Sequence, residues 1–280
     1  MTGTGITTLL LIIANIAFSY KGFTNEAFFD GYKFEVDKIL VNKDYKRLIT
    51  SGFLHVSWTH LVFNMMTLYF FSGSVEFYFG GAKFLVIYFA SLIGGDMLSL
   101  LVHRHHGDYS AVGASGAVCG IIFASIAVFP GMSIGFFGLL HIPGWLFGII
   151  YVLFSIYGIR SGKDNIGHDA HLGGALVGMA IALIMKPAAF LENYFTILLI
   201  AVPTITFIYF ITARPQILLV DNLFYRTNKD HYSIDHKYNE ERTMRQQQID
   251  SILDKIAKHG MHSLSRKEKE LLKEYSQKID

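Results

Sequence analysis

Seven apolar segments that are candidates to cross a lipid bilayer, the first of them short, constrain the fold of this 280-residue chain more than any other feature. A membrane-spanning helix needs about 20 mostly apolar residues. Charged residues make up only 16% of the chain and the mean hydropathy is +0.38, whereas about a quarter of a typical soluble domain is charged. The sequence therefore predicts an all-α, polytopic membrane helical bundle. The predicted spans are residues 5–20, 58–79, 84–102, 111–129, 133–157, 167–186 and 193–212.

The charged residues are concentrated toward the C-terminal end of the chain. Residues 213–280 hold 13 of the 24 lysines and arginines and 11 of the 22 aspartates and glutamates. We therefore expect a six-helix core in residues 1–192, a seventh span at 193–212 and a charged tail at 213–280. The first span lacks a basic leader, so it is interpreted as a membrane helix rather than a signal peptide. The net charge of +2 does not indicate a nucleic-acid partner, and the one cysteine, Cys119, excludes an intrachain disulfide.

Two segments outside the spans have patterns of their own. Residues 21–57 alternate aromatic with charged residues, which is typical of a segment at the membrane interface; a solvated linker is the alternative. In the tail, apolar residues at helical spacing end at Gly260, and Ser265 followed by Glu268 has the pattern of a capping box. The tail is therefore predicted to form a small helical hairpin outside the bilayer, and a solvated appendage without chemistry is the favoured interpretation.

Four polar residues are predicted to lie at a similar depth in the bilayer. Ser115 and His171 lie about four residues into the fourth and sixth spans, and His60 and Asn64 lie near the start of the second. Successive spans alternate in direction, so the even-numbered spans begin at the same face. Polar and ionisable groups inside a membrane are costly and mark functional positions by default. Each residue alone would be read as packing or as a satisfied interhelical hydrogen bond, but four at one depth favour a site.

Small residues on the fourth and sixth spans predict that these two helices pack closely. Such faces let helix backbones approach one another within a membrane. That contact would bring the hydroxyl of Ser115 to His171, and a histidine within hydrogen-bond reach can take the proton of a serine. His60 and Asn64 would then be donors available to a developing oxyanion. The small residues that support this packing are Gly116, Cys119, Gly174 and Gly178.

The motifs around these positions resemble those of the rhomboid family of intramembrane serine proteases. A G-x-S-G motif alone would be weak evidence, because soluble hydrolases have an unrelated serine elbow. Together, in order and on the expected spans, the motifs are highly specific. They are H-x-x-x-x-H-x-x-x-N within residues 47–65, G-S-V-E ending at Glu76, G-A-S-G at 113–116 and A-H-L-G-G-A-L-V-G at 170–178.

The resemblance implies a role for each of these residues. Ser115 would be the nucleophile and His171 the general base, without a third carboxylate. Substrates would be other membrane proteins, cut in or near a transmembrane helix where small or helix-weakening residues expose the peptide bond, and no metal or cofactor is expected. The oxyanion would be held by the backbone N–H of Ser115 and by a surrounding set of residues, namely His60, Asn64, Gly113 and Ala114.

Two positions depart from the family pattern, and a third carries a carboxylate close in sequence to His171. Many relatives carry an aromatic residue four positions after the serine, where this chain has Cys119, so His171 is less firmly oriented or another ring takes that place. Lys46 and Arg47 stand where the family typically has a tryptophan and an arginine. Asp169 is two residues from His171, about 200° around a helix, so it is not expected to be a third catalytic member.

Membrane orientation gives two conflicting expectations. The chain is expected to be a multi-pass protein of the cell membrane, and the family usually opens its active site away from the cytosol. However, 22 of the 24 lysines and arginines fall on the active-site face of a seven-span chain, with Lys83 and Lys186 opposite. The positive-inside rule would place that face in the cytosol. We follow the family for the active site and leave open the side of the tail, the oligomeric state and the natural substrate.

Two other functions are compatible with parts of the sequence. The first is a catalytically silent rhomboid relative that binds membrane clients; such relatives typically lose the serine or the histidine, and both are present here. The second is a metal or haem membrane protein, although an H-E-x-x-H motif is absent. The histidines available to it are His55, His60, His103, His105, His106, His168 and His171.

Overall fold

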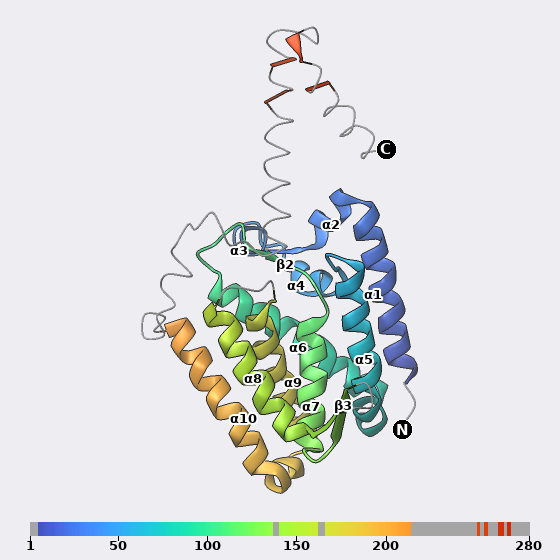
Figure 1. Ribbon diagram of the computed structural model, residues 1–280, viewed down its shortest axis with the longest axis vertical. Coiled ribbons are helices and arrows are strands. Elements are labelled where there is room, and N and C mark those ends of the chain that lie inside the picture. The colour runs from blue at the N-terminus through green and yellow to red at the C-terminus, as the bar shows by residue number, and fades with distance from the viewer. Residues whose placement is uncertain are drawn as a thin grey trace.

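The computed structural model is a bundle of long helices, shown in Figure 1. It describes residues 5–136, 140–161 and 166–213, together with residues 251–252, 255–256, 263–265 and 268–269 of the tail. The predicted all-α polytopic membrane bundle is confirmed. Its long helices are α1 (Ile6–Thr24), α5 (Trp58–Phe79), α6 (Gly81–Val102), α7 (Ser115–Val128), α8 (Gly144–Ser161), α9 (His168–Met185) and α10 (Ala188–Ala213).

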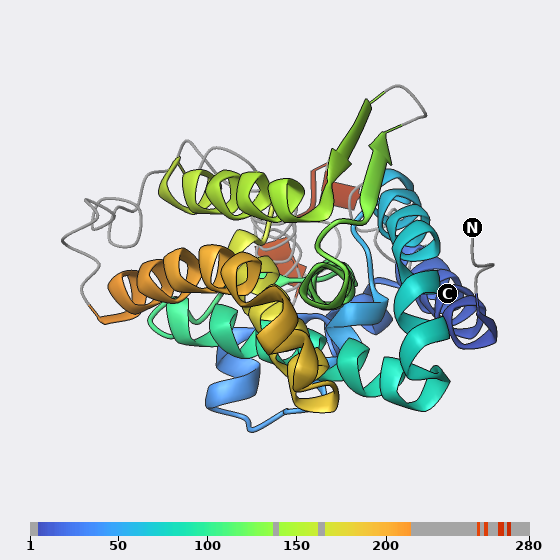
Figure 2. The same ribbon diagram turned by 90° about the horizontal axis from the view of Figure 1, so that it is seen from below.

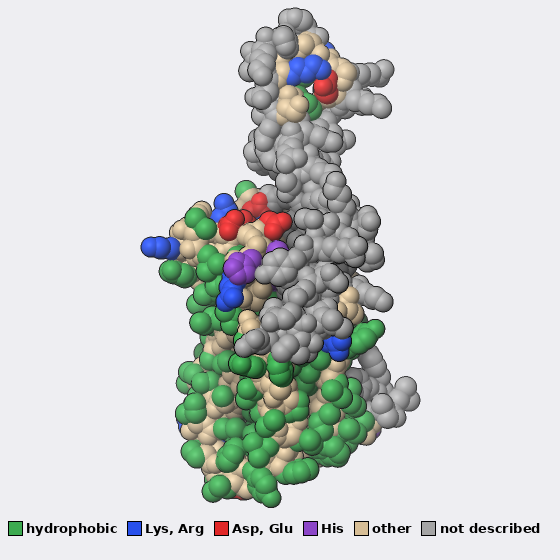
Figure 3. All heavy atoms as spheres, turned by 90° about the vertical axis from the view of Figure 1, so that its left-hand side faces the viewer, with side chains coloured by type: hydrophobic (Ala, Val, Ile, Leu, Met, Phe, Trp, Pro, Cys, Tyr) green, Lys and Arg blue, Asp and Glu red, His purple; other side chains and the backbone are tan. Residues whose placement is uncertain are grey.

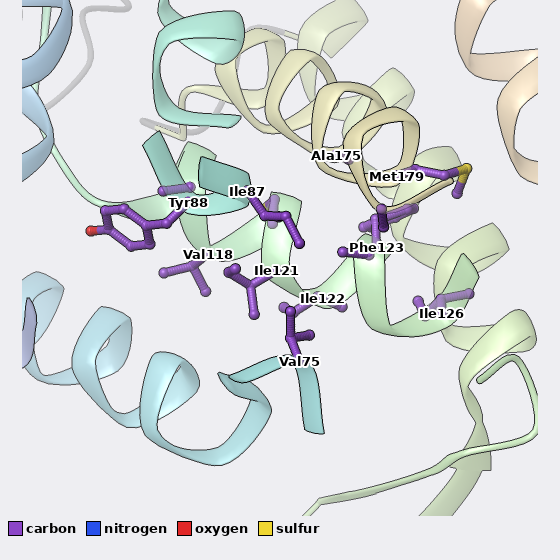
Figure 4. Close-up of a cluster of buried hydrophobic side chains, with 14 of the residues drawn as sticks. Val75, Ile87, Tyr88, Val118, Ile121, Ile122, Phe123, Ile126, Ala175 and Met179 are labelled. Atoms are coloured by element: carbon purple, nitrogen blue, oxygen red, sulfur yellow. The ribbon is translucent and has the colours of Figure 1, made fainter. Parts of the chain in front are cut away.

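The helix α7 lies at the centre of the bundle. Figure 2 shows it nearly end-on, with the other long helices around it. Every residue from Gly116 to Val128 is buried, and apolar side chains from α5, α6 and α9 close around it (Figure 4). A helix that is apolar on all sides belongs in the interior of a bundle. The residues labelled in this cluster are Val75, Ile87, Tyr88, Val118, Ile121, Ile122, Phe123, Ile126, Ala175 and Met179.

Five described helices are long and apolar enough to cross a membrane, namely α1, α6, α8, α9 and α10. The helix α7 is apolar but has only 14 residues. The helix α5 has 22 residues, and His60, Asn64 and Glu76 lower its hydropathy. The outer surface of the bundle is largely apolar, and in Figure 3 the charged and histidine side chains gather toward one end of it. Exposed apolar residues such as Phe70 and Leu191 suit a lipid-facing surface.

Backbone contact between α7 and α9 depends on glycine. A Cβ atom on Gly174 would collide with the carbonyl oxygen of Gly116, and one on Gly178 would collide with that of Gly120. The helix α6 also approaches α9 closely, because a Cβ on Gly95 of α6 would lie 2.5 Å from the carbonyl oxygen of Ala170. The expected close packing of the fourth and sixth spans is therefore observed, and it extends to the third.

The predicted boundaries of the fourth and fifth spans are wrong. The helix α7 begins at Ser115, not near residue 111, because Gly113 has a φ of +133° that no helix accommodates. Before it, β2 (Ser110–Ala111) pairs antiparallel with β1 (Phe34–Glu35). Further along, β3 (Ser133–Phe136) pairs antiparallel with β4 (Leu140–Pro143), and α8 starts only at Gly144. Pro143 cannot donate a backbone hydrogen bond within a helix, which favours a start after it.

The last span is longer than predicted and bent. The helix α10 begins at Ala188, and Asn193 inside it has non-helical backbone angles. The amide of Asn193 donates to the carbonyl oxygens of Ala127 and Val128, at 3.1 and 3.2 Å, where α7 ends. These bonds satisfy carbonyls that the end of a helix leaves without partners. The predicted boundary at residue 193 therefore coincides with a kink rather than with a helix start.

Residues 21–57 are folded against the bundle. Beyond the end of α1 they form α2 (Glu26–Tyr32), α3 (Val36–Leu40), α4 (Arg47–Thr50) and a 3₁₀ turn at Ser51–Phe53. The buried guanidinium of Arg47 donates to the carbonyl oxygens of Asp30 and Lys33 and to the carboxylate of Asp44. Packing of this kind does not fit a solvated linker. Its placement at the membrane interface stays a prediction.

The capping box predicted in the tail is present. The backbone N–H of Ser265 donates to the Glu268 carboxylate at 2.6 Å, and the N–H of Glu268 donates to the Ser265 hydroxyl at 3.4 Å. The backbone N–H of Ser265, then the ammonium of Lys255 and the hydroxyl of Ser265, lower the pKa of Glu268 to about 2. Lys255 also donates to this carboxylate, which ties the two segments of the predicted hairpin together. The remainder of that hairpin lies outside the described residues.

Candidate active site

Ser115 and His171 meet at one end of the α7–α9 contact. Ser115 is the first residue of α7, rather than lying about four residues into it, and His171 lies in the first turn of α9. The distance between the Ser115 Oγ and the His171 Nε2 is 2.7 Å. His171 is buried, whereas Ser115 is half-buried. The expected proximity of these two side chains is observed, and the hydroxyl remains partly accessible.

The imidazole of His60 lies beside the turn that leads into Ser115. A Cβ atom built on Gly113 would lie 2.9 Å from Cε1 of His60, 3.0 Å from its Nε2 and 3.8 Å from the Ser115 Oγ. Because Gly113 has a positive φ and no side chain, the ring can approach the backbone here. Ala114, which is fully buried, caps α7 immediately before Ser115. His60, Gly113 and Ala114 are thus grouped around the serine.

Asn64 is less directly engaged. Its side-chain amide donates to the backbone carbonyl of His60 one turn earlier in α5, at 3.1 Å. Among the described residues no hydrogen bond joins Asn64 to Ser115 or His171. The two residues of α5 share a face, as their spacing predicts, but only His60 reaches the turn at Gly113.

A second histidine, His55, packs against the ring of His60. His55 is fully buried, its Nδ1 is 2.8 Å from the hydroxyl of Ser19 on α1, and its ring meets that of His60 edge-on at 4.8 Å between centroids. Burial, and then the nearby His60, lower the pKa of His55 to about 3. His55 is therefore neutral at physiological pH and packs as a polar ring rather than as a charge.

Sequence reasoning missed a tyrosine that contacts His171. Tyr151 of α8 places its hydroxyl 2.9 Å from the His171 Nδ1 and 2.9 Å from the Sγ of Cys119. The expectation that another ring replaces the aromatic absent at position 119 is met, but through a hydrogen bond: the ring centroids of Tyr151 and His171 are 6.3 Å apart. The available signal was a phenol on a largely apolar span, but Tyr157 on the same helix gave the same signal.

Asp169 bonds away from the serine. Its carboxylate lies 3.1 Å from the His103 Nε2 and accepts a hydrogen bond from Ser99 of α6 at 2.6 Å. This agrees with the prediction that Asp169 is not a third member beside His171. Within the described residues, no group of three His, Cys, Asp or Glu side chains could hold a metal ion.

The fold and the site together define a polytopic membrane protein with a serine and a histidine in hydrogen-bond contact between two helices. The Rhomboid domain family matches residues 42–188, more than half of the chain. The chain therefore belongs to the rhomboid family and is a multi-pass protein of a lipid bilayer. A second match covers residues 232–278 in the tail, to a family of unknown function (DUF6576).

Several curated proteins are similar to this chain. RHOMBOID-like protein 12, mitochondrial, of Arabidopsis thaliana is 30% identical over 184 residues, which are 60% of this chain and 54% of that protein. Rhomboid protease GluP of Bacillus subtilis is 27% identical over 192 residues, 68% of this chain and 36% of the protease. Rhomboid protein 1, mitochondrial, of Saccharomyces cerevisiae is 29% identical over 157 residues, 53% and 45% of the two chains. The chain spans about half the length, or less, of these relatives.

Proposed function

We propose that this protein is an intramembrane serine endopeptidase that cuts transmembrane segments of other membrane proteins. Ser115 acts as the nucleophile and His171 as the general base. The observation that carries the proposal is the 2.7 Å contact between the Ser115 Oγ and the His171 Nε2 at the start of a central helix. Membership of the rhomboid family, and similarity to a relative named as a protease, support it.

The proposed reaction is acyl transfer through a serine ester. The Ser115 Oγ attacks the carbonyl carbon of the scissile peptide bond while its proton passes to the His171 Nε2. The tetrahedral intermediate then collapses: the C–N bond breaks, and His171 returns the proton to the leaving amine. Water, activated by the same imidazole, hydrolyses the ester and frees Ser115. No metal or cofactor takes part in this scheme.

The oxyanion is stabilised by groups around the start of α7. The backbone N–H of Ser115 is one of the N-terminal donors that a helix leaves unpaired, and the helix dipole favours negative charge there. The ring of His60 lies against the adjacent Gly113, with its Nε2 3.0 Å from the position of a Cβ on that glycine, and we assign this nitrogen as the donor to the oxyanion. Asn64 reaches the oxyanion after its amide turns away from the carbonyl of His60.

Substrates are transmembrane segments with small or helix-weakening residues near the cut. A peptide bond in a regular helix has its carbonyl hydrogen-bonded and its carbon shielded, so unwinding precedes attack. Water reaches such a site only through a polar cavity open to one face. Residues 21–57 lie at that face, because the N–H of Gly113 donates to the carbonyl of Ser51. We place the protein in the cell membrane with this face away from the cytosol.

Orientation can be tested with a membrane-impermeant thiol reagent. A cysteine introduced at Lys43, in the exposed part of the segment that carries the site, is expected to be labelled from outside intact cells, whereas one introduced at Lys83 is not. The reverse pattern would agree with the positive-inside rule and overturn the proposed orientation. A Cys119→Ala background is unsuitable because Cys119 contacts Tyr151, so the native buried thiol is retained.

Cleavage of a transmembrane reporter tests the activity. The wild-type protein is expected to cut it, and Ser115→Ala and His171→Ala are expected to lose turnover while still folding. A fluorophosphonate probe should label the wild-type protein and not Ser115→Ala. Ser125→Ala is the matched control, because Ser125 lies on the same helix but bonds to Ser74. Full activity of Ser115→Ala would refute the assignment, and client binding without cleavage by the wild type would support the silent relative instead.

A further inference from the structure

We infer that Tyr151 is a positioning residue that fixes the proton of His171 on Nδ1. Cys119 is the last acceptor in this series of hydrogen bonds. The inference rests on the proposed function of Ser115 and His171. It concerns contacts on the side of the imidazole away from the serine. Those contacts come from α8 and from one turn further along α7 than Ser115.

The four side chains form a continuous hydrogen-bonded chain. The separations are 2.7 Å from the Ser115 Oγ to Nε2, 2.9 Å from Nδ1 to the Tyr151 hydroxyl and 2.9 Å from that hydroxyl to the Cys119 Sγ. The ring of Tyr151 is itself held, stacked on Phe147 at 5.7 Å and edge-on to Phe123 at 5.8 Å. The hydroxyl is therefore presented to His171 by a side chain with little freedom of its own.

The donor-to-acceptor direction of these hydrogen bonds decides whether His171 can act as a base. Neutral imidazole carries one proton, and Nε2 can accept from Ser115 only when that proton is on Nδ1. An Nδ1–H donates to the Tyr151 oxygen, whose own proton then points to sulfur. In the reverse direction the thiol donates to the phenol and the phenol to Nδ1, which leaves the proton on Nε2. The phenol donates in both directions, to sulfur in the first and to Nδ1 in the second, and the proposed role of His171 as the base requires the first.

The same arrangement stabilises the histidine once it has taken the serine proton. Both ring nitrogens are then donors, and the Tyr151 oxygen accepts from Nδ1 in a charge-assisted hydrogen bond. His168 lies 6.0 Å from the His171 ring on the same helix. The acidic groups from the neighbouring α6 and from α9 are bonded elsewhere: Asp96 accepts from Ser51, and Asp169 accepts from Ser99 and contacts His103. The Tyr151 hydroxyl thus lies at the ring nitrogen that a carboxylate contacts in a Ser-His-Asp triad.

Cys119 is suited to this role by its size as well as by its sulfur. It is buried at 4% exposure, and its Sγ contacts the phenol directly. A larger ring at this position would occupy the space that the Tyr151 hydroxyl fills. The small side chain of Cys119 therefore leaves room for the contact between its sulfur and the Tyr151 hydroxyl.

The test compares the rate at which a fluorophosphonate labels Ser115 in the full-length protein over a range of pH. Tyr151→Phe keeps the ring contacts and removes the hydroxyl. It is expected to slow labelling by about 10- to 100-fold, the range of a hydrogen bond to a charged group, and to move the acid limb of the profile to lower pH. Cys119→Ser should retain most of the rate. Tyr157→Phe, an exposed position on the same helix, is the control and should match wild type.

The outcomes separate this inference from the proposed function. Labelling of Ser115→Ala would overturn the proposed function itself. An unlabelled Ser115→Ala together with a Tyr151→Phe that matches wild type in rate and pH profile would overturn the inference alone. If Tyr151→Phe does not fold, nitrogen-15 NMR spectra of the wild-type protein at alkaline pH determine which ring nitrogen of neutral His171 carries the proton. The His171 signal is assigned by its loss in His171→Ala. A proton on Nδ1 supports the inference, and a proton on Nε2 refutes it.

Discussion

The α7–α9 contact and the polar contacts around it hold the site in two different ways. In the first, backbone meets backbone at Gly174 and Gly116, and no side chain is present that could move aside. In the second, the tips of side chains meet, as at the Tyr151 hydroxyl, the Asp169 carboxylate and the His55 ring. We therefore expect substitutions in the backbone contact to act as all or none, and substitutions in the polar contacts to have graded or pH-dependent effects.

The largest effect is expected from Gly174→Val. Its side chain would enter the space occupied by the backbone of Gly116, and overpacking of this kind costs about 3 kcal/mol when the neighbour cannot yield. Separation of α7 from α9 would also separate Ser115 from His171, so cleavage should be lost. Thermal unfolding in detergent and reporter cleavage measure the two effects. Gly31→Ala is the control, because nothing lies within 4 Å of its added Cβ, and an unchanged unfolding midpoint for Gly174→Val would contradict the comparison.

The next effect concerns the turn before the serine. Gly113→Ala adds a Cβ at a φ of +133°, 2.9 to 3.0 Å from the ring of His60. Backbone strain at such a position costs about 1–3 kcal/mol, and displacement of His60 should lower the cleavage rate by about 100-fold, similar to loss of an oxyanion donor. Gly131→Ala, which meets nothing within 4 Å, should leave the rate unchanged. A Gly113→Ala protein with a normal rate would show that His60 does not act through this contact.

The contrast between the two kinds of contact also explains what could be predicted from the sequence. Small residues three and four positions apart on two spans indicate a close contact whatever else the helices touch, so the pairing of Ser115 with His171 was predictable. Tyr151 was not, because it is one of two tyrosines on α8 and nothing in their spacing distinguishes it from Tyr157, while its partners lie on other helices. The pairing of β3 with β4 was missed because an apolar run of this length fits either a strand pair or a helix until Pro143 is considered.

The start of α7 shows the same limit at a finer scale. The sequence remains apolar through residues 111–114, so the predicted helix began there. The positive φ of Gly113 and the strand pairing of Ser110 with Glu35 exclude a helix at these residues. Local backbone conformation at a glycine is set by contacts with distant residues, here the carbonyl of Ser51 and the ring of His60. Such contacts cannot be predicted from composition or from the spacing of residues along the sequence.

A smaller effect is expected at the polar contact between α6 and α9. Asp169→Asn weakens a buried charge-assisted pair with His103 and a hydrogen bond from Ser99, and should lower the free energy of unfolding by about 2 kcal/mol. Because Asp169 does not contact His171, the cleavage rate of the folded variant should fall by less than about 10-fold. A triad aspartate replaced in this way loses about 10⁴-fold. A loss of that size in Asp169→Asn would show that Asp169 takes part in catalysis.

The smallest effect depends on pH and arises at His55. Its pKa is lowered to about 3 in the folded protein, against about 6.5 in an unfolded chain. Between these values the unfolded state binds the additional proton, so stability is complete above pH 6.5 and decreases as the pH falls toward 3. Unfolding midpoints at pH 7.5 and 5.5 should differ by the equivalent of about 1 kcal/mol from this residue. His55→Asn, which cannot be protonated, should reduce the difference by that amount, and an equal pH dependence in both proteins would show that folding does not lower the pKa of His55.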